Sequence, residues 1–315
     1  MKVRAIIIAA SILIVQGTAT QIAMSAPPTY KIKTIKDIED LAAHLVNTEH
    51  LEDAKRILVP GCQRPNATGG MHALLAKCYM DDPGETAHNS QLIKQELETA
   101  MKLDPQSGRV YRIWAEYYNL QGDYKKAITF AQKGLEVKMP DPDSCYRQLS
   151  IAYSNLGDYE KALKYHEERL KYGTGLRSES YYRTKAPWLE KLNRRKETIE
   201  AWRNSIKQRN SDSNVMSLIA CMERFGQYQD AIDELTKLLA RNPADDEAMA
   251  RRASLYIKQK KYPEALRDYS NAIDSDPSAR LYRARASLYQ LMGQPAKAAT
   301  DLEKAKKEDN SFQRY

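Results

Sequence analysis

The chain has 315 residues, of which 42% are hydrophobic and 29% are charged, and its formal net charge at neutral pH is +8. This balance excludes a bundle of membrane-spanning helices, which is far more apolar, and a disordered chain, which has fewer apolar residues. The 20 tyrosines far outnumber the three phenylalanines and three tryptophans. Because a tyrosine ring packs while its hydroxyl stays hydrated, they favour a thin structure with many half-buried positions.

The N-terminus predicts a secretory signal peptide. Lys2 and Arg4 precede an apolar run over residues 5–15, and small residues follow it, which is the usual order in such a peptide. Polar residues from Gln16 onward keep the run short of the roughly 20 apolar residues that a membrane-spanning helix needs. We therefore expect residues 1–19 to be cleaved, in preference to an uncleaved membrane anchor.

Residues 20–34 contain two consecutive prolines and are expected to form a linker. Beyond it, basic residues are spread along the chain and do not form blocks, as on a solvated helical surface. Since export also removes the chain from nucleic acid, we expect no nucleic-acid partner.

The chain has four cysteines, Cys62, Cys78, Cys145 and Cys221. An exported protein can form disulfides, and only Cys62 and Cys78 are close enough in sequence to suggest a pair. The alternative is that all four are small packing residues.

A short pattern recurs along the chain at a spacing of 33 to 36 residues. Each copy has a large residue, then four positions later a glycine or its equivalent, and five positions after that a small residue. The small residues are Ala127, Ala162, Ala231, Ala265 and Ala298, with Thr198 in one degenerate copy. Glycine permits the tight turn between two helices, and alanine lets the two helices approach closely.

Prolines end several copies at nearly the same phase: Pro105, Pro140, Pro243 and Pro277. Together these features resemble the tetratricopeptide repeat, a helical hairpin of about 34 residues. The resemblance implies an all-α fold, a right-handed superhelical solenoid of about eight such hairpins. Stacked hairpins share a continuous core, which a single hairpin cannot form.

The solenoid is expected over residues 35–312. Its units are expected near residues 35–68, 69–107, 108–142, 143–178, 179–211, 212–245, 246–278 and 279–312. The weakest should be the fifth, because Pro187 lies inside its first helix and Thr198 replaces the packing alanine.

No enzyme motif is present, and we expect neither catalysis nor a cofactor. The five histidines lack the spacing of H-E-x-x-H metal sites, and no nucleophile motif occurs. Four residues in a lengthened turn have side chains that can bind a metal: Asp81, Asp82, Glu85 and His88. A polar solvated loop is the favoured interpretation, so the sequence predicts no metal site.

The resemblance also implies a binding surface, since the first helix of each hairpin lines a concave groove in this family. Arg112, Arg147 and Arg183 occupy the same place in three consecutive repeats. Further polar residues are expected on this face: Arg109, Asn119 and Asn155, with Arg280 and Arg283 in the final repeat. Such a basic stripe suits an acidic partner. The alternative is that the arginines cover tyrosines and pair with Glu116 or Glu190.

The sequence therefore predicts an exported scaffold, periplasmic or extracellular, that binds another protein or a peptide in the groove. No stable membrane span is expected once the signal is removed. The alternative is a non-catalytic accessory subunit of a cell-envelope enzyme or assembly complex.

Overall fold

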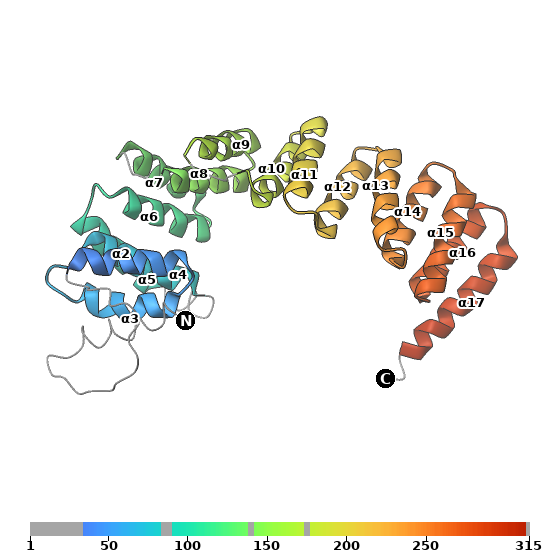
Figure 1. Cartoon of the computed structure of the whole chain (residues 1–315), viewed down its shortest axis with the longest axis horizontal. Helices are drawn as coiled ribbons and strands as arrows, with labels where there is room; N and C mark the ends of the chain where they lie inside the picture. The colour runs from blue at the N-terminus through green and yellow to red at the C-terminus, as the bar shows by residue number, and fades with distance from the viewer. Residues whose placement is uncertain (1–33, 83–89, 138–141, 173–176, 313–315) are drawn as a thin grey trace. The chain divides into compact units, whose positions relative to one another are not determined.

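The computed structural model describes residues 34–82, 90–137, 142–172 and 177–312. These residues form sixteen α-helices and one short 3-10 turn, with no strand among them (Figure 1). The expected all-α class is therefore confirmed. The expected signal peptide lies outside the described residues.

The chain divides into two compact units, Met1–Leu176 and Arg177–Tyr315. In the first unit the helices pair two by two, in sequence order, to form hairpins. The hairpins are α2 (Ile35–Asn47) with α3 (Leu51–Cys62), α4 (Gly69–Asp81) with α5 (Ser90–Leu103), α6 (Gly108–Leu120) with α7 (Tyr124–Glu136), and α8 (Asp143–Asn155) with α9 (Tyr159–Glu168). The turn η1 (Arg169–Lys171) follows. First helices also contact one another, α4 touching α2 and α6, and α6 touching α8.

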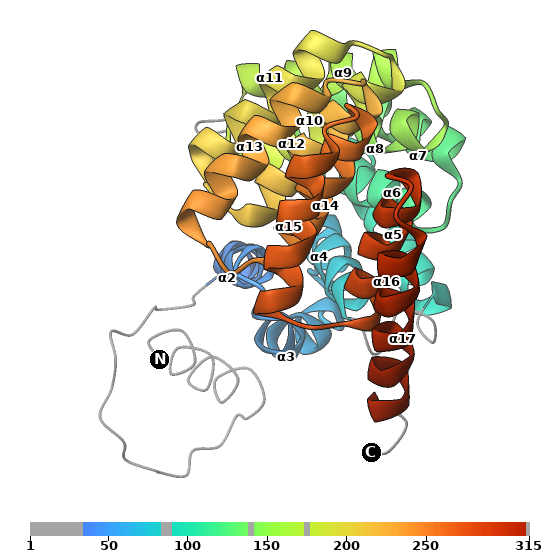
Figure 2. The same ribbon diagram turned by 90° about the vertical axis from the view of Figure 1, so that its right-hand side faces the viewer.

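The second unit is built in the same way. Its hairpins are α10 (Glu179–Lys191) with α11 (Arg195–Gln208), α12 (Asp212–Arg224) with α13 (Tyr228–Arg241), α14 (Asp246–Lys258) with α15 (Tyr262–Ser275), and α16 (Ala279–Leu291) with α17 (Pro295–Phe312). Within each unit the second helix of a hairpin packs on the first helix of the same hairpin. Where another hairpin follows in that unit, it also packs on the first helix of that hairpin (Figure 2). This is the arrangement of a helical repeat solenoid. No helix in the described ranges is both long and apolar enough to cross a bilayer.

The turn and packing residues behave as the repeat pattern predicts. Gly122, Gly157, Gly226 and Gly293 all have φ between +70° and +80°, a backbone conformation that costs glycine little. Asn193 and Lys260 take the same left-handed conformation in copies without glycine. The small residues, from Ala127 to Ala298, are 0–2% exposed, which leaves room for close helix contact.

Tyrosines line the hairpins of the first unit as half-buried rings. Tyr118 stacks on Trp114 with ring centroids 5.4 Å apart, and Tyr153 stacks on Tyr165 at the same distance. A lysine covers each outer face, Lys126 over Tyr118 and Lys161 over Tyr153. These half-buried places, packed on one ring face and covered by a lysine on the other, suit the amphipathic tyrosine side chain.

The fifth hairpin holds the two expected irregularities. Helix α10 continues through Pro187, whose side chain is exposed. Thr198 is fully buried, and its hydroxyl donates to the Arg194 carbonyl at 2.9 Å. The extra polar atom of threonine is therefore satisfied within its own helix.

Of the cysteines, Cys78, Cys145 and Cys221 are buried in the helical packing and Cys62 is partly buried. Cys62 and Cys78 are free thiols. Burial raises the pKa of each of these two thiols to about 12, so both are protonated at neutral pH.

Candidate functional site

Two of the expected groove arginines are held by carboxylates of the first unit. Arg109 on α6 donates to Glu39 on α2 at 2.5 Å, and Glu39 also accepts from the Thr68 hydroxyl. Arg112 reaches Glu116 one turn along its own helix at 3.5 Å. Glu116 is bound more closely by Lys77 of α4, at 3.0 Å. Arg109 therefore links the hairpins of its unit, while Arg112 is only weakly paired.

Arg147 occupies the place on α8 that Arg112 has on α6, and its side chain is exposed. Among the residues that the structure describes, no carboxylate lies within ion-pair distance of it. Its positive charge is therefore open to solvent on the first-helix face, by which we mean the exposed side of α4, α6 and α8.

The two asparagines differ in their surroundings. The Asn119 amide donates to both the backbone and side-chain oxygens of Gln148 on α8, at 3.0 and 2.9 Å. Its own side-chain oxygen is buried and has no hydrogen-bond partner among the residues that the structure describes. Asn155 is exposed and donates to Ile151 of its own helix at 2.9 Å. Asn119 thus joins two hairpins, whereas Asn155 makes only a local bond.

The remaining arginines of the expected stripe belong to the second unit. Arg183 is exposed and lies 3.6 Å from Glu179 on the preceding turn of α10. In the last hairpin Arg280 lies 3.5 Å from Asp246, and Arg283 pairs with Asp309.

Ion pairs tie the first helices of the second unit together. Glu190 of α10 pairs with Arg224 of α12, and Glu223 of α12 accepts two bonds from Arg251 of α14. Asp246 of α14 and Arg280 of α16 continue the series. The charges on this side of the second unit are therefore largely neutralised between hairpins, in contrast to Arg147.

Two buried ion pairs recur in the last two hairpins. Arg252 makes a bidentate contact with Asp268 at 2.7 and 2.8 Å, and its third nitrogen donates to Thr236 of the preceding hairpin. Arg285 does the same with Asp301 and with Ser270. Both aspartates are at most 3% exposed. Each arginine thus joins three helices, and the hydrogen bond to Asp268 raises the pKa of Arg252.

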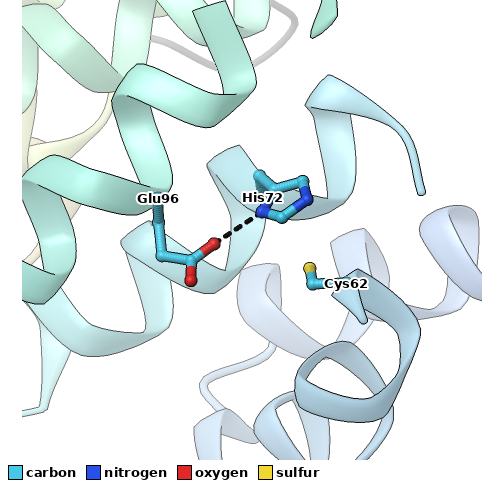
Figure 3. A group of neighbouring side chains, drawn as sticks. All are labelled: Cys62, His72 and Glu96. Carbon is cyan, nitrogen blue, oxygen red and sulfur yellow. Dashed lines mark hydrogen bonds and ion pairs between the residues drawn. The ribbon is translucent and has the colours of Figure 1, made fainter. Parts of the chain in front are cut away.

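In the first unit the fold brings together three metal-binding side chains that the sequence does not group. Cys62 at the end of α3, His72 on α4 and Glu96 on α5 point toward one another (Figure 3). His72 Nδ1 lies 2.6 Å from Glu96 Oε2. One ligand atom from each residue lies within 4.8 Å of the others. A thiol, an imidazole and a carboxylate in one place form a candidate metal centre.

The lengthened turn whose side chains could bind a metal, according to the sequence, is a different place in the chain. Asp81 pairs with Lys77 at 2.5 Å and Asp82 pairs with Lys55 at the same distance. Glu85 and His88 lie outside the described residues. The position of His72 was the usable signal, because the corresponding place in the other hairpins has an apolar residue or a tyrosine.

Comparison with known proteins identifies the repeat. Residues 144–178, 223–280 and 251–311 match models described as the tetratricopeptide repeat. A TPR repeat-containing thioredoxin of Arabidopsis thaliana is 38% identical over 85 residues, and these cover 27% of this chain and 22% of that protein. A FAM10 family protein of the same plant is 38% identical over 78 residues, which are 24% of this chain and 18% of that one. The chain thus spans about a fifth of the length of these relatives.

Two solved structures share the fold. Pseudomonas aeruginosa pilF has a TM-score of 0.53 and 16% identity, covering 66% of this chain and 92% of that one. The Cut9 and Hcn1 hetero-tetramer of the APC/C has a TM-score of 0.51 and 13% identity, covering 87% of this chain and 50% of the other. At these identities the likeness concerns the fold alone.

Proposed function

Because the chain is a tetratricopeptide-repeat protein, we propose that it is an exported, non-catalytic scaffold that binds another protein or a peptide. The repeat fold is consistent with a protein-interaction scaffold. The binding surface in this proposal is the first-helix face of the first unit, with Arg147 and Arg112 as its cations. Arg109, Asn119 and Asn155 are the further proposed residues of this unit, and Arg183 is a separate candidate on the second unit.

The exposed charge of Arg147 is the observation that carries the proposal. On the second unit, Glu190 and Glu223 pair with arginines of the next hairpin's first helix, whereas Arg147 has no ion pair among the described residues. A guanidinium that is open to solvent is ready to form charge-assisted hydrogen bonds with a carboxylate. An acidic partner segment is therefore the proposed ligand.

The test of this surface is the replacement of Arg147 by Gln, which keeps hydrogen-bonding capacity and removes the charge. The partner captured by the wild-type chain from an envelope extract is titrated against both proteins. Because hydrogen bonds to charged groups contribute about 1.5–3 kcal/mol, we expect affinity to fall at least about tenfold. The salt dependence of binding should also weaken.

Lys133→Gln is the matched control. It removes one exposed positive charge from the same unit, but on the second helix α7, and should leave affinity unchanged. Equal affinities and salt dependences for all three proteins would place the binding surface elsewhere.

Export is tested separately, by N-terminal sequencing of the protein recovered from the cell envelope or the medium. The mature chain should begin near Thr20, after the apolar run and small residues of the expected signal. Soluble cytosolic protein that still begins at Met1 would contradict export and leave the binding proposal to stand on its own test.

A further inference from the structure

The place of His72 is apolar or tyrosine in every other hairpin. It is the fourth residue of the first helix, and its equivalents are Ile38, Tyr111, Tyr146, Tyr182, Val215, Met249 and Tyr282. The place of Cys62, near the end of the second helix, is also apolar in six of the other hairpins: Met101, Leu135, Leu170, Ile206, Leu239 and Ile273, with Lys306 in the last. At these two places the first two hairpins therefore carry a thiol and an imidazole, where nearly all of the other hairpins have an apolar residue or a tyrosine.

The place of Glu96 is aromatic in the next two hairpins and holds a carboxylate in the last three, Glu234, Asp268 and Asp301. Its equivalents in the next two hairpins are Phe130 and Tyr165, which contact Tyr111 and Tyr146 with ring centroids 6.2 Å apart. In the second hairpin the same contact between the two helices is made by His72 and Glu96. An aromatic pair in neighbouring hairpins is thus an imidazole and a carboxylate here, with a thiol beside them.

From this geometry we propose that Cys62, His72 and Glu96 bind a zinc ion at the junction of the first two hairpins. This zinc site does not depend on whether the first-helix face binds a partner. The donor set of sulfur, nitrogen and oxygen is one that Zn²⁺ accepts, with ligand distances of about 2.0–2.3 Å. Three protein donors leave a fourth tetrahedral position, which water takes in sites of this kind.

The distances permit such a site with small side-chain adjustments. Tetrahedral zinc places pairs of ligand atoms about 3.4–3.6 Å apart, as follows from its bond lengths. In the structure one ligand atom from each residue lies within 4.8 Å of the others, and His72 Nδ1 is 2.6 Å from Glu96 Oε2. The ion would take the place of the proton between imidazole and carboxylate, and the Cys62 thiol would release its proton to solvent as zinc binds. Both side chains are largely enclosed, at 11% and 18% exposure, so the ion would be only partly hydrated.

The experiment is titration of the reduced, metal-free full chain with zinc chloride in a calorimeter. We expect one equivalent to bind. Cobalt(II) in place of zinc should give a thiolate-to-metal charge-transfer band together with the absorption of a tetrahedral ion. Cys62→Ser should abolish that band, and Glu96→Gln, which keeps the size of the side chain, should weaken zinc binding at least about tenfold.

Two further variants keep the result decisive. His72→Tyr introduces the residue that the third and fourth hairpins carry at this place, and it should fold and bind no zinc at this site. Cys221→Ser removes a buried thiol of the second unit and should bind zinc as the wild type does. Absence of binding by the wild type overturns the proposal, as does equal binding by all variants. A cobalt spectrum without a thiolate band would also overturn it, because Cys62 would then not be a ligand of the bound ion.

Discussion

Arg252 is expected to be important for the stability of the second unit, because it pairs with the buried carboxylate of Asp268. Arg252→Met would leave Asp268, which is 1% exposed, without the guanidinium that now binds both of its oxygens. Breaking a buried pair by removing one partner destabilises a protein by about 3–5 kcal/mol. We expect a loss of this size in the free energy of unfolding, measured with urea.

The same hairpin offers a matched control in Arg267, which is exposed on α15. Arg267→Gln should change stability by less than about 0.5 kcal/mol. A comparable loss in both variants would show that positive charge in general matters, and would remove the special role of the buried pair.

Cys221 predicts a specific dependence of stability on pH. Burial raises its pKa from 9.0 to about 11, Glu190 adds to the shift and Arg224 opposes it. Between these values the unfolded chain loses the thiol proton while the folded chain keeps it. The stabilisation is therefore complete below about pH 9 and is lost as pH rises through about 11.

Cys221→Ala isolates this contribution from the titration of tyrosine and lysine. The stability difference between wild type and variant should shrink by up to about 1.4 kcal/mol per pH unit within the window, as measured by urea unfolding at several pH values. A constant difference would mean that the thiol ionises equally in both states.

At the residue scale, the local pattern predicted the turn glycines and the buried alanines, since both roles depend on positions a few residues apart. The pairs of Arg252 and Arg285 were not predictable in this way. Charged residues usually mark a solvated helix face, and only the packing of three helices encloses these two. The joining of Cys62, His72 and Glu96 was missed for the same reason, because they come from three helices.

At the scale of the element, α10 contains a residue that works against its own helix, as α3 does with Pro60. Pro187 has no backbone N–H, so the carbonyl four residues earlier loses its helical hydrogen bond. Pro187→Ala should therefore stabilise the protein, by roughly 1–3 kcal/mol, as measured by thermal unfolding.

Pro263 is the control, because it lies in the first turn of α15, where proline removes no intrahelical bond. Pro263→Ala should have no stabilising effect, and a slight loss is expected from the greater freedom of the unfolded chain. If Pro187→Ala destabilises the protein, Pro187 itself is needed for packing, and the expectation that this hairpin is the weakest loses its main support.

For the whole molecule, the repeat pattern predicted an all-helical stack, because hairpins with the same packing residues must pack in the same way. The repeat pattern did not predict the division into two units between Leu176 and Arg177, since hairpins on both sides carry the same turn and packing positions. The degenerate copy with Thr198 follows directly after this division. The expected groove depended on the family resemblance. Some carboxylates that pair with first-helix arginines, such as Glu190 and Glu223, lie on other hairpins, and periodicity alone does not predict these pairs.

The joint made by Arg252 and Arg285 has a consequence for the length of the second unit. Each arginine needs one hydroxyl from the hairpin before it, Thr236 in one case and Ser270 in the other. If a copy of residues 246–278 were inserted after residue 278, the Arg252 of the copy would find the Ser270 hydroxyl in the place that Thr236 has for the original Arg252. The copy would also offer the same serine to the hairpin that follows. These hairpins are thus interchangeable modules, and the chain can be lengthened here by duplication with every buried charge still paired.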